Sequence, residues 1–277
     1  MDRIRLIASD MDATLLDEQS QLPADFEETI HALAELGIRF APASGRPLYT
    51  LEAMFPTLQD ELVFIGDNGG AIRWKGQNLF TSEMSPEGWR ALNRLTREQG
   101  DIAVLCGLES AYVERPFAVH DAVLRHFYTK IEYVDRLEDV TAPADKFTIY
   151  LPQHNAQQAY DTVYASQRSI YSVAVAGECW VDIMNPGVHK GAALQTLGQL
   201  WGLPSESIMA FGDTYNDAEM LQTVRYGFLM ENGSEPLRQK VPFLAPSHRE
   251  AGVMQILQKV LAQNGFVCPA DFTPAHE

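Results

Sequence analysis

Apolar and polar residues along the chain follow a pattern that predicts parallel strands connected by helices. Residues 4–9 form a short apolar run that ends abruptly at Asp10, as is typical of a buried parallel strand. A helix is expected over 23–37, where apolar residues recur at spacings of three and four. Further strands are predicted at 38–43 and 63–65. This order favours a Rossmann-like, doubly wound α/β fold with a parallel sheet.

The pattern changes between residues 81 and 185, where shorter segments alternate. Strands are expected there at 102–105, 146–151, 169–176 and 179–184, and helices at 86–98, 117–127 and 155–167. The first pattern then resumes with a helix from residue 190, strands at 208–211 and 241–244 and a helix at 253–261, before a frayed tail of about a dozen residues. We therefore predict an α/β core of residues 1–80 and 186–277, interrupted by an inserted α+β cap domain of residues 81–185.

The composition is that of a globular protein with a strong acidic bias. Of the 277 residues, 46% are hydrophobic, and 21 Lys and Arg face 37 Asp and Glu, which gives a net charge of −16. This charge argues against nucleic acid and membrane as partners, and no apolar run approaches the roughly 18 residues of a membrane span. The N-terminus shows no secretory signal, and the separated Cys106, Cys179 and Cys268 predict free thiols. We expect a cytoplasmic protein.

Three of the predicted strands end in polar clusters that suit phosphate chemistry. The clusters are Asp10-Met11-Asp12-Ala13-Thr14, Ser44-Gly45-Arg46-Pro47 and Gly212-Asp213-Thr214-Tyr215-Asn216-Asp217. Ligands of open α/β sheets bind beyond the carboxyl ends of the strands. A single cluster would mean little, because Asp, Gly and Asn are common loop residues. Three clusters at three strand ends indicate one shared site.

Lys190 adds a positive charge to this acidic set. It opens a predicted helix, and a cation at a helix N-terminus opposes the helix dipole by about 0.3–1 kcal/mol. A solvated lysine therefore more often lies elsewhere along a helix. An anionic partner for Lys190 is the better explanation.

Together these motifs resemble the signature of the haloacid dehalogenase superfamily, and within it the Cof-type phosphatases, which carry an inserted cap of class IIB. The family's Asp-x-Asp-Gly-Thr block is matched at Asp10, Asp12 and Thr14, its Ser/Thr-Gly-Arg-Pro block at Ser44, Gly45, Arg46 and Pro47, its Lys-Gly pair at Lys190 and Gly191, and its Gly-Asp-x-x-Asn-Asp block at Gly212, Asp213, Asn216 and Asp217. Asp67-Asn68-Gly69 is similar to the family's Asn-Gly turn after the third strand.

The sequence departs from the family pattern in two places. Ala13 stands where the family has glycine after its second aspartate. The later Met-Gly-Asn segment reads Met230-Glu231-Asn232-Gly233. Neither departure removes a side chain expected to take part in catalysis.

The resemblance implies a Mg²⁺-dependent phosphatase of small phosphorylated metabolites, such as sugar phosphates. Asp10 is expected to form an aspartyl-phosphate, with Asp12 as general acid and base. Mg²⁺, which prefers hard oxygen ligands, would be held by Asp10, Asp213 and the backbone carbonyl of Asp12. Residues expected to bind phosphate or substrate are Met11, Ser44, Gly45, Arg46, Lys190 and Asn216, with Thr14 and Asp217 in support. For Arg46, an ion pair that shapes the loop is an equal alternative to ligand contact.

Two other functions fit the same motifs. A phosphomutase of the superfamily would protect its aspartyl-phosphate from water, and a binding or regulatory protein that retains the fold would catalyse nothing. An intact set of Asp10, Asp12, Lys190 and Asp213 argues against the second alternative, since a binding protein needs no nucleophile beside an acid. The cap is expected to act as a lid that excludes water and selects the leaving group. Its residues Glu109, Tyr112 and Cys179 are candidates to face the site.

Overall fold

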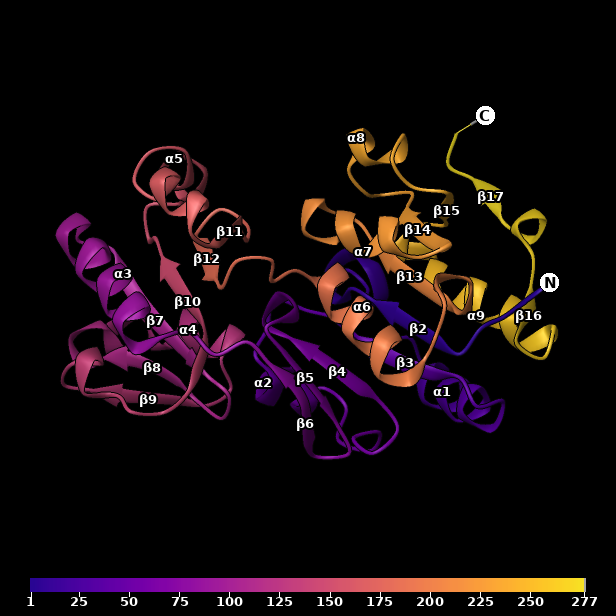
Figure 1. The fold of residues 1–277 in the computed structure, drawn as a ribbon, viewed down its shortest axis with the longest axis horizontal. Coiled ribbons are helices and arrows are strands. Elements are labelled where there is room, and N and C mark those ends of the chain that lie inside the picture. The colour runs from indigo at the N-terminus through magenta and orange to yellow at the C-terminus, as the bar shows by residue number, and fades with distance from the viewer. Residues whose placement is uncertain (277) are drawn as a thin grey trace.

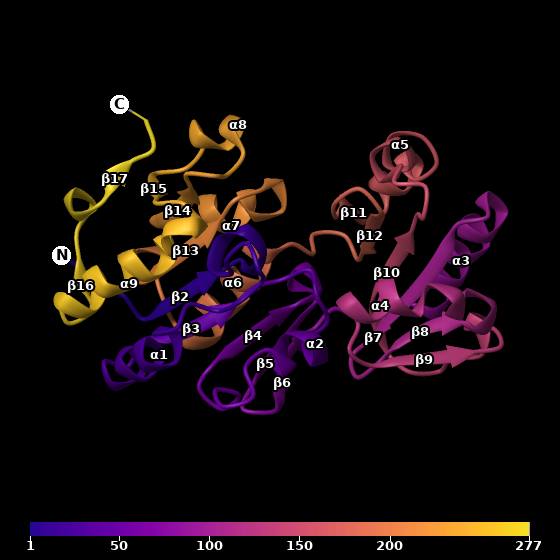
Figure 2. The same cartoon turned by 180° about the vertical axis from the view of Figure 1, so that it is seen from behind.

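The computed structural model describes residues 1–276 and consists of two lobes that lie side by side (Figures 1 and 2). One lobe carries both termini, and the other carries α3 to α5 with β7 to β12. None of the helices within residues 1–276 combines the length and the apolar composition that a membrane crossing requires.

The first lobe is built on a six-stranded sheet with the order β17-β15-β14-β13-β2-β3. Five of its strands are parallel to one another, namely β2 (Leu6–Ser9), β3 (Arg39–Pro42), β13 (Ile208–Gly212), β14 (Tyr226–Met230) and β15 (Phe243–Ala245). The edge strand β17 (Thr273–Pro274) is antiparallel to β15. The mixed α/β fold with a parallel sheet that the sequence predicts is confirmed.

Helices cover both faces of this sheet. The helices of the lobe are α1 (Phe26–Glu35), α2 (Leu48–Ala53), α6 (Lys190–Trp201), α7 (Ala218–Thr223), α8 (Glu235–Arg238) and α9 (Gly252–Ala262). Successive residues of a strand point to opposite faces, so Ile7 packs in the core cluster with α1 and α9. Its neighbours Leu6 and Ala8 pack in the cluster with α6 and α7. Both faces of β2 are therefore buried, and this explains its continuous apolar run.

Smaller sheets extend the first lobe. An antiparallel sheet consists of β4 (Val63–Gly66), β5 (Ala71–Trp74) and β6 (Gln77–Thr81), and a short pair joins β1 (Asp2–Arg3) to β16 (Phe266–Val267). A parallel bridge between Ala43 and Ile65 connects the end of β3 to β4. The antiparallel sheet lies next to the second lobe in both ribbon views.

The second lobe is a six-stranded sheet with helices packed on it. Its strand order is β11-β12-β10-β7-β8-β9. The strands are β7 (Ile102–Gly107), β8 (Ala111–Glu114), β9 (Ile131–Val134), β10 (Ala144–Tyr150), β11 (Ser172–Val175) and β12 (Trp180–Met184), and the helices are α3 (Pro86–Gln99), α4 (Asp121–Phe127) and α5 (Ala156–Asp161). All pairs are antiparallel except β8 with β9. The domain limits at residues 80 and 185 stay a prediction.

Three predicted segments differ most from the observed ones. The helix expected at 117–127 is a 3-10 turn over Arg115–His120 followed by α4, and the helix expected at 155–167 ends at Asp161. Apolar spacing does not distinguish a 3-10 turn from an α-helix over so few residues. The tail expected to be frayed is instead held by pairing of β16 with β1 and of β17 with β15.

Candidate active site

The three polar clusters meet at the carboxyl edge of the main sheet. Asp10 follows β2, Ser44 lies two residues after β3, and Asp213 follows β13, and these strands are neighbours in the sheet. The strand order reverses here, because the chain continues from β2 to β3 on one side and returns later to β13 on the other. Crevices at such reversals are the usual ligand sites of open α/β sheets. The backbone amide of Asp10 donates to the carbonyl of Phe211, 2.9 Å away, which ties the first loop to β13.

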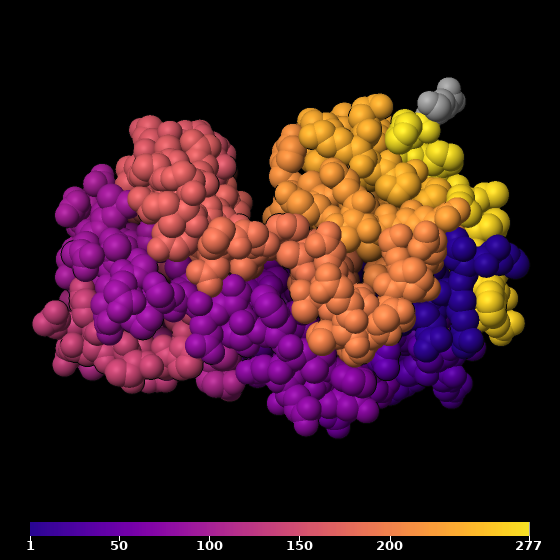
Figure 3. All heavy atoms as spheres, in the orientation of Figure 1, coloured from indigo at the N-terminus to yellow at the C-terminus, as the bar shows by residue number. Residues whose placement is uncertain are grey.

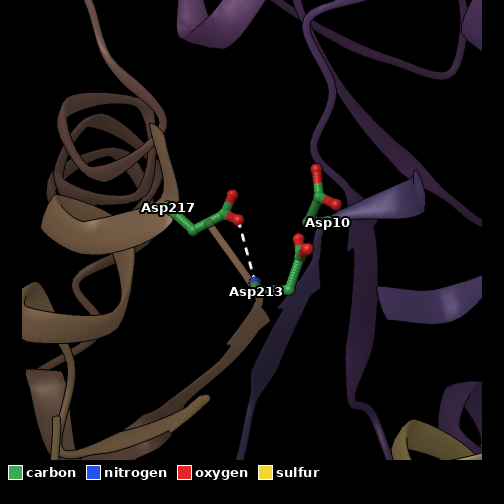
Figure 4. Close-up of side chains that lie close together, drawn as sticks. All are labelled: Asp10, Asp213 and Asp217. Carbon is green, nitrogen blue, oxygen red and sulfur yellow. Dashed lines mark hydrogen bonds between the residues drawn. The ribbon is translucent and has the colours of Figure 1, made fainter. Parts of the chain in front are cut away.

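Asp10, Asp213 and Asp217 form a cluster of buried carboxylates (Figure 4). Each offers an oxygen atom within 4.8 Å of the others. Thr14 donates from its hydroxyl to Asp213 across 3.3 Å, so the predicted supporting residue contacts a cluster member. Three carboxylates in so small a volume repel one another and require positive charge nearby.

Lys190 supplies part of that charge. Its side chain is fully buried, and Nζ donates to Asp10 and, across 2.7 Å, to Asp217. Burial alone would lower the pKa of Lys190, but the carboxylates of Asp10 and Asp217 raise it above the usual value. The ammonium therefore stays charged. Lys190 is the first residue of α6, where a cation opposes the helix dipole. Its two carboxylate partners offset that cost and account for its position.

One ammonium does not balance three carboxylates. Burial raises the pKa of Asp10 well above its usual range, Lys190 opposes this change, and Asp217 and Asp213 add to it. Burial and then Asp217 raise the pKa of Asp213 to about 6. A second cation beside Asp10 and Asp213 would offset the repulsion between the carboxylates and hold both in their charged form.

The donor set fits a hard divalent cation. Asp10 and Asp213 present carboxylate oxygens, which Mg²⁺ prefers, at the edge of a cavity with room for water ligands. Asp217 is committed elsewhere, because its Oδ2 accepts from the amides of Asp213 (3.0 Å) and Thr214 (3.2 Å) and its Oδ1 accepts from Lys190. Figure 4 shows the first of these bonds. The contacts favour Asp217 as a support rather than a metal ligand.

Gly212 lets the side chain of Asp217 pack against the end of β13. A Cβ atom at residue 212 would overlap the side chain of Asp217, so only glycine lets the loop after β13 fold back over that carboxylate. Thr214 completes the turn, since its side chain and the carboxylate of Asp217 form a reciprocal capping pair. The Gly-Asp-x-x-Asn-Asp spacing therefore has a steric cause.

Asp12 and Arg46 pair at the mouth of the site. Arg46 Nη2 donates to both carboxylate oxygens of Asp12, at 2.7 and 3.0 Å, and 58% of the Asp12 side chain is exposed. Asp12 is thus accessible to a ligand while the buried Asp10 lies deeper. Met11, which lies between Asp10 and Asp12 in the sequence, has its side chain fully buried in the hydrophobic core. Only its backbone is therefore available for contact with a ligand.

Hydrogen bonds to Ser44 hold the loop after β3. The Ser44 hydroxyl accepts from the amide of Arg46 (3.1 Å), and the Ser44 carbonyl accepts from the amide of Asn68 (2.9 Å). Ser44 is buried, whereas Asn216 on the opposite side is exposed and accepts from the Thr214 hydroxyl at 2.6 Å. Ser44, Gly45 and Asn216 all line the same cavity as Asp10.

Ala13 adopts a left-handed backbone conformation, with φ of 60° and ψ of 12°. Asn232 Nδ2 donates to its carbonyl oxygen across 2.8 Å, and Asn232 Oδ1 accepts from the amide of His248 (3.0 Å). Asn232 belongs to the second segment that departs from the family pattern, so the two departures are in contact. A left-handed alanine costs about 1–2 kcal/mol that glycine would avoid.

We expect Ala13→Gly to give a kcat/KM equal to or higher than that of the native enzyme. The strain removed is offset by about 0.4–1 kcal/mol of added unfolded-state entropy, so stability should change by less than about 1 kcal/mol. The matched control Ala34→Gly, on the exposed face of α1, should lose about 1 kcal/mol and leave the kinetics unchanged. A markedly slower Ala13→Gly enzyme of equal stability would show that Ala13 is fitted to its substrate.

A cavity of about 630 Å³ separates the two lobes above the carboxylates. Its first-lobe wall includes Asp10, Asp12, Ser44 and Asp213, and its second-lobe wall includes Phe127, Lys146, Thr148, Cys179, Trp180 and Asp182. Figure 3 shows that one face of the molecule has a notch between the two lobes. Of the second-lobe residues expected to face the site, Cys179 does so, whereas Glu109 pairs with Arg73 (2.6 Å) and Tyr112 borders a separate pocket.

Lys146 in β10 joins the second lobe to the loop after β3. Its buried Nζ donates to the carbonyl of Gly45 (2.5 Å) and pairs with Asp67 (3.0 Å) and Asp182 (3.5 Å). Asn68 Nδ2 also donates to Asp182, at 3.0 Å. The sequence predicted none of these contacts. The sequence signal that could have indicated them is the presence of Lys146 and Asp182 inside two apolar strand segments.

Comparison with known proteins places the chain in a family. The sequence profile of the haloacid dehalogenase-like hydrolases matches residues 7–257. A 5-amino-6-(5-phospho-D-ribitylamino)uracil phosphatase of Escherichia coli is 31% identical, covering 93% of this chain and 96% of its own length. An HMP-PP phosphatase of Cronobacter sakazakii is also 31% identical, over 87% of this chain and 89% of its own.

Solved structures agree with this placement. A protein from Streptococcus mutans superposes with a TM-score of 0.85 at 28% identity, covering 94% of this chain and 99% of that chain. The fold also matches a HAD/COF-like hydrolase from Plasmodium vivax, with a TM-score of 0.84 at 18% identity over 95% of this chain and 97% of that chain. The chain belongs to the haloacid dehalogenase-like hydrolases. The predicted resemblance and the prediction of an enzyme with phosphatase activity are confirmed.

Proposed function

We propose that this protein is a Mg²⁺-dependent phosphatase that hydrolyses small phosphorylated metabolites through an aspartyl-phosphate on Asp10. The observation that carries the proposal is the contact of Asp10 with the buried ammonium of Lys190, beside Asp213 at the floor of the cavity. Asp10 lines the cavity and has a counter-charge beside it. A nucleophile requires both the opening and the counter-charge.

Asp10, Asp213 and the backbone carbonyl of Asp12 are proposed to hold the Mg²⁺ ion. When bound, the cation offsets the repulsion between the phosphate dianion and the carboxylates. Lys190 balances the remaining charge of Asp10 and Asp217. The raised pKa values of Asp10 and Asp213 support this assignment, because buried carboxylates without enough counter-charge become protonated.

In the first step, a carboxylate oxygen of Asp10 attacks phosphorus and the bond from phosphorus to the ester oxygen breaks. Asp12 gives a proton to the departing oxygen. In the second step, Asp12 takes a proton from water, whose oxygen attacks the phosphorus and releases Asp10 and inorganic phosphate. The exposed position of Asp12 at the mouth of the site supports this double role, and its salt bridge supports Arg46 as its positioning residue.

Polar groups around Asp10 are proposed to hold the phosphate oxygens, where negative charge is spread in the transition state. These groups are the Ser44 hydroxyl, the backbone amides of Met11 and Gly45, the Asn216 side chain and the Lys190 ammonium. Thr14 and Asp217 support the site through their bonds to Asp213 and Lys190. Residues 81–185 are proposed to act as the cap that excludes water during the reaction.

The substrates are proposed to be sugar phosphates and related phosphomonoesters of the cytoplasm. Cys106, Cys179 and Cys268 are all free thiols, which supports a reducing compartment. The substrate printed in the name of the Escherichia coli relative, a phosphorylated ribitylamino-uracil, is a first candidate for this enzyme as well.

The proposal is tested by measuring phosphate release from a panel of phosphomonoesters, with Mg²⁺ and with EDTA. We expect release from at least one ester with Mg²⁺ and a loss of at least about a hundredfold with EDTA. Analysis of the organic product separates hydrolysis from transfer: an isomeric phosphate ester without free phosphate would indicate a phosphomutase. Absence of any turnover would overturn the proposal.

A further inference from the structure

Part of the second-lobe wall of the cavity is aromatic. Phe127 at the end of α4, Tyr128 after it and Trp180 at the start of β12 all line the cavity. Trp180 is 8% exposed and Phe127 is partly exposed, so some of both rings remains open to the cavity. An aromatic wall inside a catalytic cavity provides a flat apolar surface for a ligand.

Neighbouring rings hold Trp180 in place. Its ring centroid lies 4.6 Å from that of Tyr150, 5.0 Å from that of Phe127 and 6.1 Å from that of Tyr128. Contacts on several sides fix the orientation of the indole before any ligand arrives. A preorganised aromatic surface loses little conformational entropy on binding.

The basic side chains that line the cavity already have polar partners. Arg46 binds Asp12, Lys146 binds Asp67, Asp182 and the Gly45 carbonyl, and His154 lies 3.1 Å from Glu178. Within the described residues, the cavity lining offers no further Lys, Arg or His for a second anionic group. A leaving group with a carboxylate or a second phosphate would therefore find no free positive charge on the cavity wall.

We propose that Trp180 and Phe127 form a subsite for a flat, uncharged ring carried by the leaving group of the substrate. This inference rests on the proposed phosphatase function and narrows it to phosphomonoesters in which a short chain or sugar separates the phosphate from such a ring. The phosphate binds at Asp10, the linking chain crosses the cavity, and the ring stacks on the indole. Trp180 is then a specificity-determining residue.

Two matched pairs of esters test the subsite. Ribitol 5-phosphate and flavin mononucleotide share the ribityl ester and differ by the ring, and ribose 5-phosphate and uridine 5′-monophosphate differ by the base. We expect kcat/KM to be roughly tenfold or more higher for the ring-bearing member of at least the ribityl pair, mainly through KM. Phosphoglycolate, with its carboxylate, should be the poorest substrate of the series.

Substitution of Trp180 assigns that preference to its side chain. In Trp180→Leu, the ratio of kcat/KM between flavin mononucleotide and ribitol 5-phosphate should fall about tenfold, and Trp180→Phe should restore part of it. Trp89→Leu removes an equally large ring from the second lobe outside the cavity, and it should leave the ratio unchanged. A general loss of fold would lower both rates together and leave the ratio intact.

The outcomes separate this inference from the proposed function. Hydrolysis of the esters without a preference for rings overturns the subsite and leaves the phosphatase standing. An unchanged ratio in folded Trp180→Leu, or in Trp180→Phe if the leucine variant does not fold, does the same. If no ester is hydrolysed, the phosphatase proposal fails, and the subsite is judged by flavin mononucleotide binding, followed by fluorescence polarisation. Equal affinities of the native protein and Trp180→Leu would then overturn it.

Discussion

Replacement of Asp10 by asparagine is expected to lower kcat by at least about a thousandfold while the protein stays folded. The amide keeps the size of the side chain and an oxygen that accepts from Lys190. It is a poor nucleophile and a weak metal ligand, so both proposed roles of Asp10 are lost together. Phosphate release on the best ester and thermal unfolding, measured on the same preparation, check the prediction.

Asp60→Asn makes the same chemical change at an exposed carboxylate that does not line the catalytic cavity. It should retain native kinetics. Mass spectrometry of the Asp10→Asn protein is needed to exclude deamidation back to aspartate. Residual activity above roughly one per cent in a preparation without deamidation would contradict the assignment of Asp10 as the nucleophile.

Replacement of Lys190 by methionine is expected to reduce both activity and stability. Methionine has a similar length, but it leaves the buried carboxylates of Asp10 and Asp217 without their ammonium. Loss of one partner from a buried ion pair typically costs about 3–5 kcal/mol. We expect that loss in urea unfolding, and a fall in kcat of at least about a hundredfold.

Two further variants test whether the lost ion pairs cause the loss of stability in Lys190→Met. Lys259→Met, at an exposed position of α9, should change stability by less than about 0.5 kcal/mol. Combining Lys190→Met with Asp217→Asn removes one of the carboxylates left without a partner, and should recover at least about 1 kcal/mol of the loss. A Lys190→Met protein with native stability and native kinetics would mean that the ammonium is dispensable.

The site could be predicted from the sequence because its residues follow strand ends in short, local motifs. Asp10, Ser44 and Asp213 each come shortly after an apolar run, and strand ends of a parallel sheet meet at one edge. An anionic partner for Lys190 could also be predicted, because a cation at a helix start opposes the helix dipole, and the structure shows that Asp217 is one such partner. Their catalytic roles remain proposals.

Contacts between the lobes could not be predicted in the same way. Lys146 and Gly45 are about a hundred residues apart, and their bond depends on how the second lobe packs on the first. A lysine in an apolar strand indicates a buried charge, but it does not name the partner. The place of Trp180 on the cavity wall depends on the same packing.

The strand β14 was missed for a different reason. Its residues Tyr226–Met230 are all buried, but Gly227 in the middle lowers the strand propensity of the run. A Cβ atom at residue 227 would overlap the carbonyl oxygen of Leu221, so close backbone packing requires glycine. The residue that weakens the sequence signal is the one that lets α7 approach the sheet.

The most direct test of the account is to trap the phosphoryl group on the enzyme. The native protein is mixed with Mg²⁺ and its best ester, quenched in acid within one turnover and digested for mass spectrometry. The account predicts one phosphoryl group on the peptide that contains Asp10, removable by hydroxylamine and absent in Asp10→Asn. An enzyme that releases phosphate but, at every quench time, carries no phosphoryl group on Asp10 would contradict it.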